Sequence, residues 1–134
     1  MKKFRLHAAA LVLFTAAAFT SCSSDDDNSN APLSKTAFVT AVTGPTTGTV
    51  NTELSLNVAF TVDNACGTFD KVLETTAANT KTIEVKAKYA GTNCGTTPAS
   101  KTTIYKFKAT SAGTYNLKFK KSATEFVTQT IVVN

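Results

Sequence analysis

Residues 54–62 read LSLNVAFTV, and this stretch decides the fold class. Every second residue is apolar, and the residues between them are small or polar. Side chains of a β-strand point alternately to its two faces, so the pattern predicts a strand with one face on a core and the other in water. The same alternation recurs at residues 83–89 (IEVKAKY), 105–109 (YKFKA) and 115–120 (YNLKFK). These segments are typical of an antiparallel sheet that covers a core on one side.

Weaker patterns predict three further strands, at residues 38–42, 68–74 and 125–133. Turn residues such as Gly44-Pro45 and Ala90-Gly91 separate the segments. About seven strands within residues 35–134 predict a single all-β sandwich domain. The only helical element we expect is one turn at residues 74–79.

One part of the domain has a counterpart in a known fold family. Residues 111–117, SAGTYNL, resemble the opening of the penultimate strand in bacterial immunoglobulin-like domains, and residues 128–133 resemble their closing strand. The resemblance implies an immunoglobulin-like antiparallel sandwich in which Tyr115 is the tyrosine-corner residue, with its hydroxyl bonded to nearby backbone. The chain departs from antibody domains because it has no Trp.

The N-terminus has the pattern of an export signal. Lys2, Lys3 and Arg5 precede an apolar run at residues 8–19. A helix of this run is about 18 Å long at about 1.5 Å per residue, which is too short to span a bilayer. Phe19-Thr20-Ser21-Cys22 resembles the lipobox of bacterial lipoproteins, which implies that residues 1–21 are removed and that Cys22 is lipidated. The alternative is an ordinary secretory signal with a chance cysteine.

An acidic segment follows the cysteine. Ser24, Asp25, Asp26 and Asp27 resemble the surface-export signal of lipoproteins in the Bacteroidetes group, which implies an outer-membrane protein facing the cell exterior. Residues 22–34 are polar and also fit a plain solvated tether, in which case the periplasmic side is the alternative location. We expect the lipid to be the only membrane attachment.

The amino-acid composition of the mature chain limits the kinds of reaction that it can catalyse. The whole chain carries 14 Lys and Arg against 9 Asp and Glu, and removal of Lys2, Lys3 and Arg5 leaves 11 − 9 = +2. Three of the acids lie in the tether, so the domain carries 11 − 6 = +5. Arg5 and His7 are the only Arg and His, and both lie in the predicted signal. General acid–base catalysis at neutral pH favours His, so we expect no enzyme, no catalytic residue, no metal and no cofactor.

Cys66 and Cys94 are the cysteines that remain if Cys22 is lipidated. Each follows a predicted strand and precedes Gly, in a chain predicted to reach an oxidising compartment. Their spacing is unlike that of a redox-active Cys-x-x-Cys pair. We therefore predict a structural disulfide.

Lysines occupy the polar positions of three predicted strands. If these strands are neighbours, the lysines form a basic sheet face that could meet acidic glycan or lipid phosphate. The alternative is that outward lysines only keep the sheet soluble and protect its edges. The residues of this predicted face are Lys86, Lys88, Lys106, Lys108, Lys118 and Lys120.

Together these patterns predict a lipid-anchored, non-catalytic binding or structural module of the cell envelope. Its expected partners are the membrane, through the lipid, and an envelope protein or glycan, with no nucleic acid. The alternative is a cysteine-protease inhibitor, because Gly44-Pro45-Thr46-Thr47-Gly48 resembles part of the Asn-Pro-Thr-Thr-Gly loop of chagasin-like inhibitors. It has Gly44 where that loop has Asn.

Overall fold

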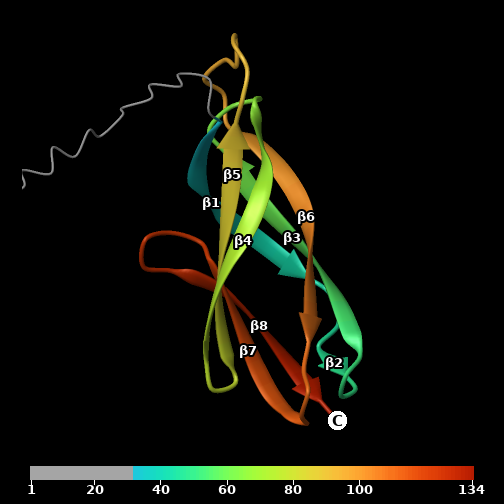
Figure 1. Cartoon of the computed structure of the whole chain (residues 1–134). Helices are drawn as coiled ribbons and strands as arrows, with labels where there is room; N and C mark the ends of the chain where they lie inside the picture. The colour runs from blue at the N-terminus through green and yellow to red at the C-terminus, as the bar shows by residue number, and fades with distance from the viewer. Residues whose placement is uncertain (1–31) are drawn as a thin grey trace, which may run out of the picture.

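A computed structural model describes residues 32–134, which form eight strands and no helix (Figure 1). The predicted signal peptide, Cys22 and the Ser24–Asp27 segment lie outside the described residues. Within the described range there is thus no helix that could cross a membrane. The strands are β1 (Leu33–Thr43), β2 (Thr47–Gly48), β3 (Glu53–Val62), β4 (Gly67–Ala77), β5 (Thr80–Tyr89), β6 (Ala99–Lys108), β7 (Gly113–Lys120) and β8 (Phe126–Val133).

The strands form two sheets that share β1. The five-strand sheet runs β4-β5-β7-β8-β2, and the three-strand sheet runs β1-β3-β6. Residues 33–37 of β1 pair with β5, and residues 38–43 pair with β3. The register shifts between Val39 and Ala41, which identifies a β-bulge at the point where β1 has crossed to the other sheet. β1 therefore joins the two sheets along one side of the sandwich.

The inner faces of both sheets form one hydrophobic core. The predicted alternation is confirmed: the inward residues of β3, β5, β6, β7 and β8 are the buried ones. Aromatic rings join the sheets, since Tyr105 of β6 meets Phe119 of β7 edge-on with centroids 5.4 Å apart. The largest fully buried side chains are Phe60, Phe107, Phe119, Leu56, Ile83, Leu117 and Ile131.

The all-β sandwich is confirmed, but its strand pairing is not wholly antiparallel. β5 pairs with β7 in parallel, and the additional short strand β2 pairs with β8 in parallel. The remaining ladders are antiparallel. The tyrosine corner has the expected contact, since the Tyr115 hydroxyl donates to the backbone oxygen of Ser111 at 2.9 Å.

The helical turn expected at residues 74–79 is wrong. Residues 74–77 continue β4, and Ala78 and Asn79 make a two-residue turn into β5. Ala78 has φ +50°, a left-handed conformation that such hairpin turns require and that residues with a Cβ adopt at a cost. An Ala at this position gives no sequence signal for the turn, which explains the error.

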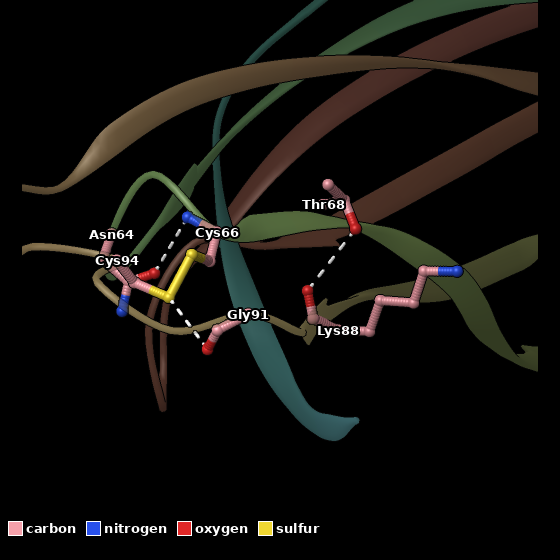
Figure 2. Close-up of a disulfide and its surroundings, with 6 residues drawn as sticks. All are labelled: Asn64, Cys66, Thr68, Lys88, Gly91 and Cys94. Atoms are coloured by element: carbon pink, nitrogen blue, oxygen red, sulfur yellow. Dashed lines mark hydrogen bonds between the residues drawn. A yellow bond between two sulfur atoms is a disulfide. The ribbon is translucent and has the colours of Figure 1, made fainter. Parts of the chain in front are cut away.

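The predicted disulfide joins Cys66 and Cys94 across the loops that follow β3 and β5 (Figure 2). The Cα atoms are 5.2 Å apart, and the Cys66 amide donates to the Asn64 side-chain oxygen at 3.1 Å. Gly91 permits the close approach, because it has φ +122° and a Cβ there would lie 3.3 Å from the Cys66 sulfur. The bridge lies at the end of the sandwich where β1 begins, opposite the C-terminus (Figure 1).

We expect Cys66→Ser and Cys94→Ser each to lower the free energy of unfolding by about 3 kcal/mol, because the closed loop of 28 residues no longer restricts the unfolded chain. The melting temperature should fall by about 10 °C or more. Calorimetry of the two single variants and the double variant measures this, and all three should melt together. Reductant should bring the parent chain to the same temperature, and a single variant that melts like the oxidised parent would contradict a stabilising role.

Candidate functional site

The outer face of the five-strand sheet carries a group of lysines that we call the lysine face: Lys71, Lys86, Lys88, Lys118 and Lys120. They lie on β4, β5 and β7. On β5 and β7 they alternate with buried residues of the inner face, and on β4 Lys71 precedes the half-buried Val72. Lys86 lies opposite Lys71 across the β4–β5 ladder, and Lys118 lies opposite Thr82 across the β5–β7 ladder. The pleat of three neighbouring strands thus presents all five ammonium groups on one side.

The structure corrects the predicted basic face in two ways. Lys106 and Lys108 lie on β6, which belongs to the three-strand sheet, so they project from the opposite side of the sandwich. Lys106 also forms an ion pair with Glu53 at 2.9 Å. Lys71 joins the face instead, and it was not predicted because the inward side of β4 could not be assigned from the sequence pattern.

Glu84 lies at the centre of the lysine face and organises it. Its carboxylate contacts Lys86 on the same strand and Lys120 on β7, the latter at 3.3 Å. The Thr36 hydroxyl of β1 donates to the same carboxylate. The hydrogen bonds from Lys86 and Thr36, with a smaller contribution from Lys120, lower the pKa of Glu84 to about 2. One carboxylate therefore fixes the positions of two of the five lysines.

The other three lysines of the face, Lys71, Lys88 and Lys118, form no ion pair with any residue between 32 and 134. The second acid at this face is Asp70, which accepts a hydrogen bond from the Ser34 hydroxyl at 2.9 Å. Five lysines against Glu84 and Asp70 leave a net charge of +3. The face therefore has positive charge that its own residues do not neutralise.

Two exposed apolar side chains extend the lysine face along one row. Leu73 of β4 lies opposite Glu84, and Phe126 of β8 lies opposite Lys120. Their exposures are 47% and 41%. The row Leu73, Glu84, Lys120 and Phe126 thus crosses four strands with charge in the middle and apolar groups at both ends, an arrangement that can hold a ligand with both anionic and apolar parts.

The outer face of the three-strand sheet differs in charge. Its central positions carry uncharged side chains, among them Ala41, Asn57, Ala59, Thr61 and Thr102. Charged residues of this face, Glu53, Lys106 and Lys108, gather at one end. The positive charge of the sandwich is therefore concentrated on the side of the five-strand sheet.

The chemistry-bearing groups elsewhere are few. Residues 32–134 contain no group of three or more His, Cys, Asp or Glu side chains that could hold a metal ion. The Tyr105 hydroxyl is the buried side-chain polar atom that lacks a hydrogen-bond partner within this range. Burial first, and the charge of Glu74 second, raise its pKa. A tyrosine held in its neutral form inside the core is suited to packing rather than to proton transfer.

Comparison with known proteins gives a family match for the domain. A family model described as the ORF11 beta-sandwich domain matches residues 56–132, which is more than half of the 134-residue chain. The match begins within β3 and ends within β8, so it includes most of both sheets. No curated protein and no solved structure matches the chain.

We expect Glu84→Gln to lower the free energy of unfolding by about 1 kcal/mol at pH 7, because it removes the charge that three partners stabilise. The pKa of Glu84 is lower in the folded chain than its ordinary value of 4.5, so this stability is present above pH 4.5 and is lost as the pH falls to about 2. Denaturant titrations between pH 2 and pH 7 measure it.

The matched control is Glu53→Gln, because Glu53 has a single partner, Lys106, and both side chains are at least half exposed. We expect a change of less than about 0.5 kcal/mol for this variant. Equal effects of the two variants, or a Glu84 effect that does not vary with pH, would contradict the central role of Glu84.

Proposed function

The chain belongs to the ORF11 β-sandwich domain family, and we propose that it is a lipid-anchored, non-catalytic binding module of the cell envelope. Its ligand in this proposal is an anionic polymer, such as an acidic or phosphorylated glycan, held on the lysine face. The observation that carries the proposal is the net charge of +3 on this face, where Lys71, Lys88 and Lys118 form no ion pair with any residue from 32 to 134.

The kind of cation supports a polymer rather than a single small anion. Lysine is a hydrated point charge on a flexible stem, whereas arginine grips one carboxylate or phosphate through two bonds. The mature domain has 11 Lys and no Arg. Neighbouring strands lie about 4.8 Å apart, so lysines on three adjacent strands can each meet a different charge of one chain. Threonines such as Thr68, Thr75 and Thr128 add hydroxyl donors on the same side.

The N-terminal sequence supports the anchor and the location. The apolar run before Cys22 and the lipobox-like residues fit lipidation, and Ser24 to Asp27 fit export to the outer-membrane surface. β1 begins at the disulfide end of the sandwich, so the lipid is attached through this end. The lysine face runs along the side of the domain from this end, where it is accessible to polymers close to the membrane.

No specific observation favours the cysteine-protease inhibitor. In residues 44–48, Thr47 and Gly48 form β2 beside β8, and the Val132 amide donates to the Thr46 oxygen at 2.8 Å. Three of these five residues are thus paired with or hydrogen-bonded to β8, whereas an inhibitory loop must be free to enter a protease cleft. The acidic residues do not support a catalytic role either, because within residues 32–134 Glu53, Asp63, Glu74 and Glu84 form ion pairs with lysines.

We expect Cys22→Ala to abolish membrane attachment, because the thiol is the proposed site of the lipid and one residue carrying two or more acyl chains is needed for a stable anchor. Detergent phase partitioning of cell extracts measures this. The parent should enter the detergent phase, and the variant should stay in the aqueous phase or remain uncut. A variant that partitions like the parent would exclude the anchor.

We expect the soluble Cys22→Ser chain to bind inorganic polyphosphate and polygalacturonate, and the triple variant Lys71→Gln, Lys88→Gln, Lys118→Gln to bind about tenfold more weakly. The control is Lys101→Gln, Lys106→Gln, Lys108→Gln on β6, which removes the same charge from the three-strand sheet. Its melting temperature is measured as well, because Lys101 lies opposite Phe60 on the inner side of β6. Calorimetric titration at 0.15 M salt measures both. Equal losses in the two triples would show that net charge alone acts, and absence of binding to either polymer would contradict the proposal.

A further inference from the structure

We propose that two copies of the chain pair through the outer faces of their three-strand sheets and form a two-fold symmetric dimer. In this dimer Phe38 of each copy contacts Ile104 of the other copy. The interface lies on the side of the sandwich opposite to the lysine face, so it is independent of the proposed ligand. Two exposed apolar side chains, their positions in the sheet and the neutral surface between them carry the proposal.

The outer face of the three-strand sheet exposes two large apolar side chains. Phe38 of β1 is 43% exposed, and Ile104 of β6 is 57% exposed. Each is followed by a buried core residue, Val39 and Tyr105 respectively, so each points away from the core. Such side chains are removed from water only by a surface outside the domain, and their burial is favourable.

Phe38 and Ile104 lie at matching positions around Ala59 of β3. Across the β1–β3 ladder Phe38 is opposite Thr61, two residues beyond Ala59 in one direction. Across the β3–β6 ladder Ile104 is opposite Asn57, two residues beyond Ala59 in the other direction. The two apolar side chains therefore lie on one diagonal of the face, with Ala59 near its midpoint.

This diagonal makes the face complementary to itself. A two-fold axis that lies in the plane of the interface, passes through Ala59 and runs perpendicular to the diagonal exchanges the two ends of the diagonal. It places Phe38 of one copy against Ile104 of the second copy, and Ile104 of the first against Phe38 of the second. Reciprocal contacts of this kind are what an isologous dimer interface requires.

The surface between Phe38 and Ile104 is small and uncharged. Ala41, Ala59 and Thr102 form a row across the three strands. Their short side chains allow a second sheet to approach to the spacing of about 10 Å at which sheets pack. The charged residues within the ladders of this face lie together at one end of it: Glu53, Lys106 and Lys108. Pairing therefore buries no charge at the centre of the interface, where an unpaired charge is costly.

The distribution of charge favours this face over the other one. The domain carries +5, so two copies repel each other where their lysines meet. The lysine face lies on β4, β5 and β7 of the other sheet, and in the dimer it points away from the interface in both copies. The neutral face is thus where two like-charged domains can meet with the least repulsion.

The size of the face predicts a weak dimer. β3 and β6 are each 10 residues long, and β1 contributes residues 38–43. With strands about 4.8 Å apart and about 3.3 Å per residue, the face has a flat area of roughly 400 Å². Two corrugated faces of this size bury roughly 1,000 Å², which is typical of weak complexes. We therefore expect a dissociation constant of about 10 to 100 µM.

Sedimentation velocity of the soluble Cys22→Ser chain from about 1 µM to about 200 µM measures the dimer. The parent should change from monomer to dimer over this range. Phe38→Glu and Ile104→Lys should each weaken self-association at least about tenfold, because each places a charge against an apolar side chain twice in the dimer. The matched control is Leu73→Lys, which adds a charge at a 47% exposed position on the lysine face and should dimerise like the parent.

The reciprocal contact gives a sharper test. An equimolar mixture of the Phe38→Glu and Ile104→Lys chains should dimerise at least as tightly as the parent. In the mixed dimer one contact joins the new Glu to the new Lys, and the other contact keeps the original Ile104 and Phe38. If a charged variant lowers the melting temperature, Phe38→Ser and Ile104→Ser repeat the test of loss with uncharged side chains.

A parent chain that stays monomeric at about 200 µM would overturn the proposal. Loss of the dimer in Ile104→Lys but not in Phe38→Glu would also overturn it, because that result indicates pairing through the open edge of β6, the last strand of its sheet. A mixture of the two charged variants that does not associate would exclude the reciprocal contact. No polymer is present in these measurements, so their outcome is separate from that of the proposed function.

Discussion

The structure depends on a single strand that serves two sheets. β1 pairs with β5 up to Ala37 and with β3 from Phe38 onward, and a bulge between Val39 and Ala41 follows this change of partner. Ala37 and Val39, on either side of the crossing, are both buried in the common core. β4 pairs with one edge of β5 along its whole length. On the other edge, β1 pairs with residues 85–89 and leaves residues 80–83 free to pair with β7. β7 pairs with this half of β5, which brings the lysines of the two strands onto one outer face.

The sequence is informative where one face of a strand is buried. Period-two alternation at residues 54–62 and in three later segments predicted the inward residues, because water and the core impose opposite demands on the two faces. The cysteine pair was predicted for a similarly local reason, as each residue follows a strand. β4 lacked such a pattern because it is an edge strand with most of its side chains exposed, so its length and its turn at Ala78 were missed.

The candidate site was predicted only in part, because it depends on which strands are neighbours. Lysine rows on β5, β6 and β7 look equivalent in sequence, but β6 pairs only with β3 and belongs to the other sheet. Glu84 contacts Lys120 and Thr36, which are 36 and 48 residues away in sequence, and no local pattern reports such long-range contacts. The outward direction of a side chain is thus predictable from alternation, whereas its cross-strand partners require the topology.

The same topology places most of the net positive charge of the domain on one side of the sandwich. If lysines occurred simply wherever a strand position faces water, the outer faces of both sheets would be equally basic. Instead the centre of the three-strand sheet carries uncharged residues, including the exposed Ile104, and the five lysines of the lysine face lie on β4, β5 and β7. A solubility role needs no such asymmetry, because charge on either face keeps a sandwich in solution. The concentration on one side of lysines that form no ion pair within residues 32–134 is the asymmetry on which the proposed anionic ligand rests.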